Sequence, residues 1–309
     1  MFEKSEQPVD FMRYVVALGG NALQNIDRQL ELKRELLPIA QLYVSGNEVV
    51  ITHGNGPQVG ELANLEAKNL AVLTAQTQAE IGTKLQTAMT AAIDACSGSR
   101  TYKRDATAVV LSRAVIDPGS GEFRNPTKPI GRFYGASEAA RIKSSHIVIK
   151  KLHGGYRRVV PSPPPKDIIE AGTIKELLSD GHLVIACGGG GIAVSTNGNA
   201  IILMDAVIDK DRTSSLLARK IDADAFFILT NVKGAYVNYG KRGQSLIKRT
   251  SLSQMERYLD QGHFEQGSMY PKVEACLDFV RATGNTAVIG NITNAGEAFA
   301  FGAATVIGP

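Results

Sequence analysis

The sequence of 309 residues predicts an α/β fold built on an open, mostly parallel sheet, and three features support this prediction. Apolar runs such as Tyr14 to Leu18 lack polar alternation, which is typical of strands covered on both faces. Segments with helical apolar spacing, such as Ile26 to Val44, separate these runs. Glycine or asparagine ends each main run. The first strand, this helix and a strand at Glu48 to Thr52 form a β-α-β unit, for which a right-handed crossover is the strong default.

Four of the predicted strands run directly into turns rich in glycine and asparagine. Carboxyl ends of parallel strands share one sheet edge, where ligands of open α/β folds bind, so we expect these turns close together. Glycine lets the backbone approach a ligand, and a helix starting near Asn21 or Asn25 would offer N–H groups to an anion. The turns are Gly19-Gly20-Asn21, His53-Gly54-Asn55-Gly56, Gly188-Gly189-Gly190-Gly191 and Asn231-Val232-Lys233-Gly234.

The remaining elements are predicted from periodicity and from capping residues. Asn197-Gly198 is typical of a two-residue hairpin loop. Pro271 occupies a favoured first-turn position of a helix that Gly284 ends. The pattern predicts helices over 58–70, 78–95, 167–178, 211–220 and 271–282, and further strands over 107–116, 183–187, 226–230, 286–289 and 304–307.

The segment from Asp117 to Pro165 differs from the rest of the chain because it holds more than half of the twelve prolines. Closely spaced prolines disfavour regular core strands and helices. We therefore expect this segment to leave the main sheet as a lid or protruding flap, with Tyr156 to Val160 as one of its strands.

Composition describes an ordinary globular protein and excludes several classes. The net charge of +4 comes from 34 Lys and Arg against 30 Asp and Glu spread along the chain, so no nucleic-acid footprint is indicated. Cys96, Cys187 and Cys276 are far apart in apolar or helical contexts and are expected to be reduced core residues. No signal-peptide pattern or apolar run of about 20 residues occurs, which predicts a cytoplasmic protein without a membrane span.

Three lysines occupy positions that favour a phosphate ligand. Lys128 lies between two prolines, Lys210 between Asp209 and Asp211, and Lys272 at the start of a predicted helix. A lysine at a helix amino terminus opposes the helix dipole, so an anionic partner explains it better. Each lysine alone is typical of a surface residue, and each acid alone of a local ion pair. Together with the glycine turns they indicate phosphoryl transfer, with the acids orienting the lysines or helping to coordinate Mg²⁺.

His53 is interpreted as a hydrogen-bonding turn residue rather than a general base. The turns contain neither a Walker A motif nor the spaced glycines of a dinucleotide fingerprint. The sequence instead resembles the carbamate kinases of the amino acid kinase family from about Tyr14 to its end. The blocks that carry this resemblance are Ala17 to Ala22, His53 to Gly60, Asn125 to Gly131, Val159 to Pro163, Ala206 to Asp211, Gly262 to Phe264 and Gly267 to Val273.

The resemblance implies a three-layer αβα sandwich of the amino acid kinase type with a protruding subdomain at about 117–165. It implies a homodimer, with an amino-terminal lobe over 1–172 for the small acid and a carboxyl-terminal lobe over 173–309 for ATP or ADP. The implied reaction is reversible phosphoryl transfer between MgATP and carbamate, giving carbamoyl phosphate and MgADP. Its expected physiological direction is ATP synthesis in arginine catabolism by the arginine deiminase pathway or related catabolism.

The resemblance also implies roles for individual residues. The implied catalytic residues are Lys128, Lys210, Lys272 and Asp211. Carbamate and the transferred phosphate would be lined by Gly19, Gly20, Asn21, Gly54, Asn55 and Gly56. The nucleotide would be bordered by Gly188, Gly189, Asp209, Thr230, Tyr236 and Met269. No protein metal site is implied, because Mg²⁺ enters with the nucleotide.

Departures from the family pattern lie in the nucleotide half. Ala193 stands where proline is common, and Arg212-Thr213 stand where smaller or apolar residues are expected. Two alternatives therefore stay open. One is a kinase of another small carboxylate on the same fold, and the other is a catalytically silent, nucleotide-binding regulatory relative.

Overall fold

A computed structural model describes residues 11–19, 25–65, 68–98, 105–143, 147–152 and 154–309. Its centre is a sheet of eight strands in the order β15-β17-β16-β12-β1-β2-β9-β3. Only the β16–β17 pairing is antiparallel within it, so six strands from β16 to β3 run in one direction. The strands are β1 (Arg13–Leu18), β2 (Glu48–His53), β3 (Thr107–Val110), β9 (Leu183–Ala186), β12 (Ala225–Thr230), β15 (Arg249–Ser251), β16 (Thr286–Asn291) and β17 (Thr305–Gly308). The prediction of an open, mostly parallel sheet is confirmed.

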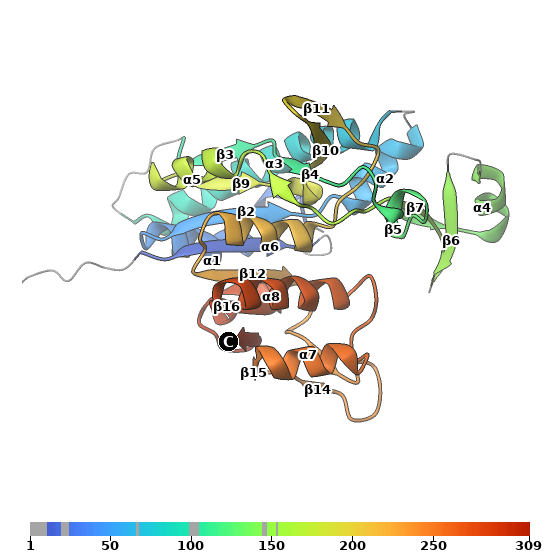
Figure 1. Ribbon diagram of the computed structural model, residues 1–309. Helices are drawn as coiled ribbons and strands as arrows, with labels where there is room; N and C mark the ends of the chain where they lie inside the picture. Colours follow the sequence, from blue (N-terminus) through green and yellow to red (C-terminus); the bar gives the residue numbers. More distant parts are fainter. Residues whose placement is uncertain (1–10, 20–24, 66–67, 99–104, 144–146, 153) are drawn as a thin grey trace, which may run out of the picture.

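Helices cover both faces of this sheet, which makes the expected three-layer αβα sandwich (Figure 1). Successive residues of β1 point to opposite faces: Val15 and Ala17 join one apolar cluster, Val16 and Leu18 the other. The first face carries α5 (Ala171–Ser179), α6 (Lys210–Lys220), α7 (Leu252–Asp260) and α8 (Tyr270–Thr283), and the second carries α1 (Gln29–Val44), α3 (Leu70–Cys96) and α9 (Ala295–Phe299).

A smaller sheet flanks the main one, in the order β11-β10-β4-β8. Its strands are β4 (Arg113–Val115), β8 (Asp167–Ile168), β10 (Ile192–Asn197) and β11 (Ala200–Leu203). The predicted hairpin joins β10 to β11, but its two-residue loop is Gly198-Asn199 and not Asn197-Gly198, because Asn197 still pairs with Ala200; Gly198 has φ +57°. The single strand predicted over 107–116 is wrong, because β3 and β4 belong to different sheets. At the break, the Gln78 amide exchanges two hydrogen bonds with the Ser112 backbone, and tertiary contacts of this kind leave no local pattern.

The protruding subdomain is present and lies to one side of the sandwich (Figure 1). The chain leaves the smaller sheet after β4 and returns at β8, which pairs with β4. Between them lie β5 (Lys128–Tyr134), α4 (Ala136–Ile142), β6 (Val148–Leu152) and β7 (Gly155–Val160), whose strands form an antiparallel sheet in the order β5-β7-β6. The expected strand at 156–160 is therefore confirmed as β7.

Several helix boundaries differ from the prediction. The first helix begins at Gln29 and not near Asn25, because residues 25–27 form a turn that the Arg28 N–H closes on the Asn25 carbonyl at 2.8 Å. The start of the predicted helix at 167 is the edge strand β8 instead. Pro271 and Gly284 delimit α8 as predicted. The remaining elements are α2 (Gly56–Leu65), β13 (Tyr236–Val237), β14 (Ser245–Leu246), η2 (Gly121–Phe123), η3 (Gly188–Gly190) and η4 (Ile292–Asn294).

The three cysteines are free thiols, with Cys187 and Cys276 buried and Cys96 half-buried, as the sequence predicted. Among the described residues, no helix is both long and apolar enough to span a bilayer. Strand β9 belongs to the predicted carboxyl-terminal lobe, but the strand order places it between β2 and β3 of the predicted amino-terminal lobe. The division into lobes at residues 172 and 173 stays a prediction.

Candidate functional site

The carboxyl ends of the parallel strands β1, β2, β9 and β12 lie at one edge of the sheet, as expected. The Gly19 N–H donates to the Leu229 carbonyl at 2.8 Å, and the Gly54 N–H donates to the Leu18 carbonyl at 3.2 Å. The turn after β9 packs directly on the turn after β2. A Cβ on Gly188 would lie 2.3 Å from Nε2 of His53, and one on Gly189 would lie 2.2 Å from Nδ2 of Asn55. Only glycine allows this close contact.

A cavity of about 730 Å³ opens beside these turns. Its walls come from the turn after β2, the protruding subdomain, the start of α6 and the segment that leads into α8. The residues that line it include Gly54, Asn55, Gly56, Lys128, Phe133, Arg157, Ser162, Gly189, Asp209, Lys210, Asp211, Arg212, Ser268 and Lys272. Segments far apart in the sequence therefore supply one polar cavity.

The start of α6 places four charged residues at this cavity, which are Asp209, Lys210, Asp211 and Arg212. Asp209 caps the helix, and its Oδ1 accepts hydrogen bonds from the backbone N–H groups of Asp211 at 2.9 Å and Arg212 at 3.4 Å. The other oxygen of Asp209 pairs with Lys128, which arrives from β5 of the protruding subdomain. Lys210 is buried and pairs with Asp211. The carboxylate of Asp209 thus both caps α6 and binds Lys128.

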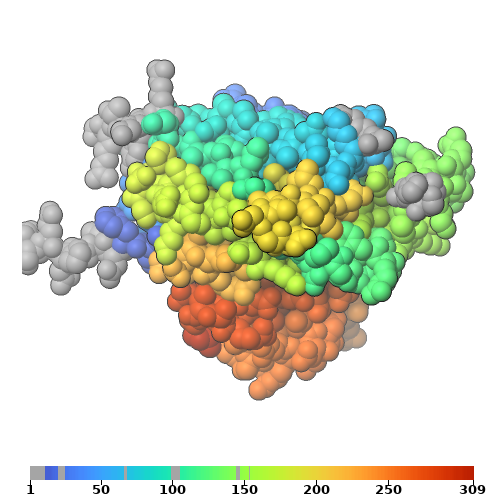
Figure 2. Space-filling model, turned by 45° about the horizontal axis from the view of Figure 1, so that its top comes forward, coloured from blue at the N-terminus to red at the C-terminus, as the bar shows by residue number. Residues whose placement is uncertain are grey.

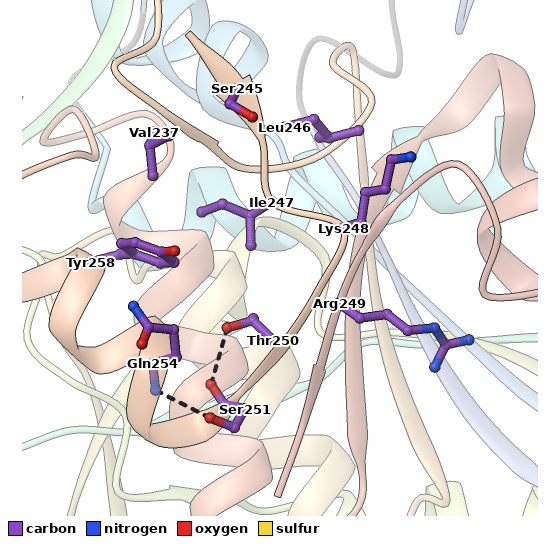
Figure 3. A pocket seen from close by; sticks show the side chains of 10 residues that line it. All are labelled: Val237, Ser245, Leu246, Ile247, Lys248, Arg249, Thr250, Ser251, Gln254 and Tyr258. Carbon is purple, nitrogen blue, oxygen red and sulfur yellow. Dashed lines mark hydrogen bonds between the residues drawn. The ribbon is translucent and has the colours of Figure 1, made fainter. Parts of the chain in front are cut away.

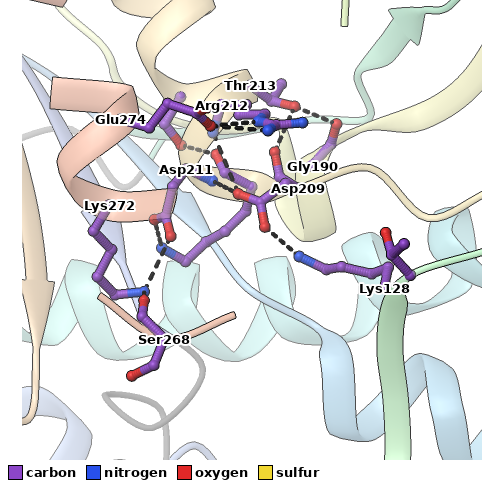
Figure 4. Close-up of polar contacts among 12 residues, drawn as sticks. Lys128, Gly190, Asp209, Asp211, Arg212, Thr213, Ser268, Lys272 and Glu274 are labelled. Carbon is purple, nitrogen blue, oxygen red and sulfur yellow. Dashed lines mark hydrogen bonds and ion pairs between the residues drawn. The ribbon is translucent and has the colours of Figure 1, made fainter. Parts of the chain in front are cut away.

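Lys272 reaches the same place from the first turn of α8. Its Nζ lies 3.1 Å from Oδ2 of Asp211, so Asp211 joins two lysines. Figure 4 shows Lys128 and Lys272 approaching the two aspartates from opposite sides. This arrangement confirms that the fold brings the three predicted lysines together with the two acids. Their catalytic roles stay predictions.

Electrostatics favour the charged forms of Asp209, Asp211 and Lys272 despite their burial. Burial acts to raise the pKa of Asp209 and Asp211, but the neighbouring lysines outweigh it and hold both pKa values below the usual range. For Lys272, burial acts to lower the pKa, but Asp211 outweighs burial and raises it. Burial dominates at Lys210 and lowers its pKa. The acids therefore stabilise cations at a site that also offers backbone donors.

His53 lies against this cluster but does not fit the role of a general base. The residue is buried, and its Nδ1 lies 3.1 Å from the Gly54 carbonyl oxygen. Burial lowers the pKa of His53 to about 4, and Lys210 adds to this effect. The side chain is thus a neutral turn residue at neutral pH, in agreement with the sequence interpretation.

Not every predicted site residue lines the cavity. Gly20 and Asn21 lie outside the described residues. Thr230 is buried at the end of β12, Tyr236 lies in β13 beside Tyr239, and Met269 packs on the apolar cluster under α8. Gly188 packs against His53, and the Gly19 N–H donates to the Leu229 carbonyl. The predicted residues that do not border the cavity are Gly19, Gly188, Thr230, Tyr236 and Met269.

The sequence analysis missed two arginines at the cavity. Arg212 forms an ion pair with Glu274, 2.9 Å from Nη2 to Oε2, which ties α6 to α8. Arg157 comes from β7 of the protruding subdomain. A signal for Arg157 was available, because it lies two residues before the Val159 to Pro163 block. Nothing local shows which of Arg157 and Arg158 faces the cavity.

The departures from the family pattern have defined positions. Ala193 is fully buried in a small apolar cluster of the second sheet. The Thr213 hydroxyl donates to the Gly190 carbonyl at 2.8 Å and so links α6 to the glycine turn. Neither residue disturbs the contacts among the lysines and acids.

A second cavity of about 330 Å³ lies between the β14–β15 segment and α7 (Figure 3). Lys248 and Arg249 border it, but their side chains are directed away from Gln254 and Tyr258. Its residues make no acid–lysine cluster like that of the first cavity. The larger cavity is therefore the candidate active site.

Comparison with known proteins agrees with this geometry. Residues 12–291 match the amino acid kinase family. A carbamate kinase of Thermoplasma volcanium is 41% identical over 96% of this chain and 100% of its own length. A carbamate kinase-like protein, YqeA, of Escherichia coli is also 41% identical, over 96% of this chain and 98% of its own. The structure of carbamate kinase from Giardia lamblia bound to AMP-PNP superposes with a TM-score of 0.84, at 34% identity over 97% of this chain and 99% of that one.

The chain therefore belongs to the amino acid kinase family, whose members here are phosphotransferases. Within that family, it falls in the group that contains the carbamate kinases.

Proposed function

We propose that this chain is a carbamate kinase that catalyses reversible transfer of a phosphoryl group between MgATP and carbamate. The observation that carries the proposal is the convergence of Lys128, Lys210 and Lys272 on one cavity beside glycine turns. Phosphoryl transfer needs positive charge over the moving group and positioned donors, with little covalent work from the protein. The full-length similarity to carbamate kinases supports the same reaction.

The chemistry of the acceptor agrees with the cavity, because its described residues include no Asp–His or Ser–His pair. Carbamate is already an anionic oxygen nucleophile, so its attack on the γ-phosphorus needs no proton removal. His53, the histidine beside the cluster, is neutral and engaged with its own turn. In the proposed step, the carbamate oxygen forms a bond to phosphorus while the bond to the ADP oxygen breaks. The lysines stabilise charge on both oxygens and on the transferred group.

The proposed roles are those that the family resemblance implies. Lys128, Lys210 and Lys272 contact phosphate oxygens, and Asp211 orients the last two lysines. The turns with Gly19, Gly20, Asn21, Gly54, Asn55 and Gly56 hold carbamate and the transferred group. Gly188, Gly189, Asp209, Thr230, Tyr236 and Met269 border the nucleotide in the carboxyl-terminal lobe. Mg²⁺ would enter with the nucleotide and would supply charge neutralisation, because Asp209 and Asp211 are paired with lysines.

The physiological direction is proposed to be ATP synthesis from carbamoyl phosphate in arginine catabolism. A cytoplasmic location is proposed with it, and the three free cysteines agree with a reducing compartment.

The decisive experiment measures ATP formation from MgADP and carbamoyl phosphate. Wild-type protein should form ATP, and Lys210→Ala should lose roughly 100-fold or more in kcat, as expected when one electrostatic donor is removed. A folded wild-type protein that forms no ATP would contradict the proposal. Nucleotide binding by calorimetry would then identify a silent relative, and turnover of acetyl phosphate would identify a kinase of another small carboxylate.

We further propose a homodimer that forms through the edge of β11. The four residues of this edge strand are all exposed, and Ile201, Ile202 and Leu203 are 44%, 50% and 47% exposed. Figure 2 shows this yellow region at the surface beside the amino-terminal half of the chain. An apolar edge strand is a template for pairing with another strand. Light scattering should give a dimer for wild type and a monomer for Ile202→Lys, and a dimer in both would refute this interface.

A further inference from the structure

Five cations border the main cavity among the residues that the structure describes, and four of them have carboxylate partners. Lys128 pairs with Asp209, Lys210 and Lys272 pair with Asp211, and Arg212 pairs with Glu274. The fifth is Arg157, for which the described residues provide no ion pair.

The Arg157 side chain is held in place, but one of its N–H donors has no hydrogen-bond partner among the described residues. Its Nη2 donates to the Gly131 carbonyl at 2.6 Å, and its guanidinium carbon lies 5.2 Å from the centre of the Phe133 ring. Its Nε is enclosed and has no hydrogen-bond partner in the described part of the chain. An enclosed donor without a partner is unfavourable. A ligand in the cavity that Arg157 borders would supply acceptors for the N–H groups of the guanidinium that it can reach.

The neighbouring Arg158 shows that this situation is specific to Arg157. Because side chains alternate along a strand, Arg158 lies on the other face of β7. Its Nη1 donates to the Ala63 carbonyl of α2 at 2.7 Å, and it does not border the cavity. One arginine thus anchors the protruding subdomain, and the other faces the cavity without a carboxylate.

We propose that Arg157 is a further substrate-binding cation, which binds a phosphate oxygen of the ligand in the main cavity. A guanidinium presents a planar fork of donors that matches phosphate, and an aromatic ring beside it fixes its plane. Phosphate oxygens in this cavity come from the nucleotide or from the acyl phosphate. The inference rests on the proposed phosphoryl transfer, and it assigns the protruding subdomain a second cation besides Lys128.

Kinetic comparison of three variants tests this role. Arg157→Met removes the fork, Arg157→Lys keeps the charge, and Arg132→Met removes an exposed cation of the same subdomain that pairs with Glu138 outside the cavity. Arg157→Met should lower kcat/KM by about 10- to 100-fold, the range for a charge-assisted hydrogen bond. A rise in KM for MgADP identifies the nucleotide as the source of the phosphate oxygen, and a rise for carbamoyl phosphate identifies the acyl phosphate. Arg157→Lys should fall between wild type and Arg157→Met, and Arg132→Met should match wild type.

A purely structural role gives a different result. In that case, Arg157→Met lowers the melting temperature through the lost Gly131 bond, while both KM values match those of Arg132→Met, and the proposal is overturned. If Arg157→Met does not fold, unchanged KM values in Arg157→Lys overturn it equally. If wild type forms no ATP from carbamoyl phosphate, the proposed function fails separately. MgATP binding is then measured by calorimetry. Weaker binding to Arg157→Met than to Arg132→Met would support the role of Arg157, and equal binding would refute it.

Discussion

Two lysine–aspartate arrangements meet in the cavity, and they are built differently. Lys210, Asp211 and Lys272 belong to the starts of α6 and α8, which pack on one apolar cluster. The side chains of Lys210 and Asp211 are 10% and 4% exposed. Lys128 and Asp209 join α6 to the protruding subdomain, and their side chains are 26% and 16% exposed. The first arrangement is part of the core, whereas the second depends on where the subdomain lies.

The attachment of the subdomain explains this difference. A small apolar cluster that includes Val59, Ile130 and Val160 holds it to the rest of the molecule. Gly60 of α2 meets Gly131 of β5 with no room for a side chain between them. Accurate positioning of Lys128 therefore depends on a few contacts rather than on a large core.

The largest expected effects on catalysis come from replacing one lysine of each arrangement. Lys272→Met should reduce kcat by about 100-fold or more and should also weaken MgADP binding, because Lys272 belongs to the half proposed to bind the nucleotide. Lys128→Met should reduce kcat comparably, with the KM for MgADP changing by less than roughly threefold. Steady-state kinetics for both substrates provide the measurement. Equal and mild effects from the two substitutions would remove the distinction between the two arrangements.

A smaller effect is expected at the attachment of the subdomain. A Cβ on Gly60 would lie 1.9 Å from the Gly131 nitrogen, and both sides of this contact are backbone. Gly60→Ala should therefore lower the free energy of unfolding by about 3 kcal/mol and reduce kcat by moving Lys128. Urea unfolding and kinetics give the two readouts. Gly172→Ala in α5, where a Cβ meets open space, is the matched control and should be neutral or slightly stabilising. Wild-type values in Gly60→Ala would show that the subdomain is positioned by other contacts.

The smallest expected effect is the pH dependence of stability that comes from His53, in the glycine turn after β2. His53 has a pKa of about 4 in the folded protein against a usual value of 6.5. The unfolded chain therefore binds more protons between these values, so stability is present above pH 6.5 and is lost as the pH falls toward 4. From pH 7 to pH 5 the contribution of His53 should fall by about 2 kcal/mol.

Urea unfolding at the two pH values measures this loss. His53→Gln should lose less stability than wild type between pH 7 and pH 5. His263→Gln, which removes a histidine bonded to Gln261 away from the cavity, should keep the wild-type difference. An unchanged difference in His53→Gln would mean that His53 is protonated in the folded protein, contrary to its burial.

Local sequence was sufficient for the core sheet and for much of the site. Apolar runs without polar alternation, such as Val15 to Leu18, are favourable as strands that are covered on both faces. Glycines after such runs indicated the ligand edge, and Pro271 with Gly284 marked α8. The family resemblance added the roles of the lysines, which stay predictions. Local pattern failed at Ser112, where Gln78 interrupts a strand from 34 residues away.

Periodicity and backbone chemistry are local, so the amino-acid sequence was enough to establish most strands of the main sheet and the segment rich in proline. The partner of each charge is a long-range property, because it depends on which segments the fold brings together. Lys128 and Asp209 are 81 residues apart, and Lys272 and Asp211 are 61 apart. Arg157 and Arg158 are adjacent and chemically identical, yet one borders the cavity and the other anchors to α2. The pleat and placement of β7 distinguish them, and these are properties of the folded molecule alone.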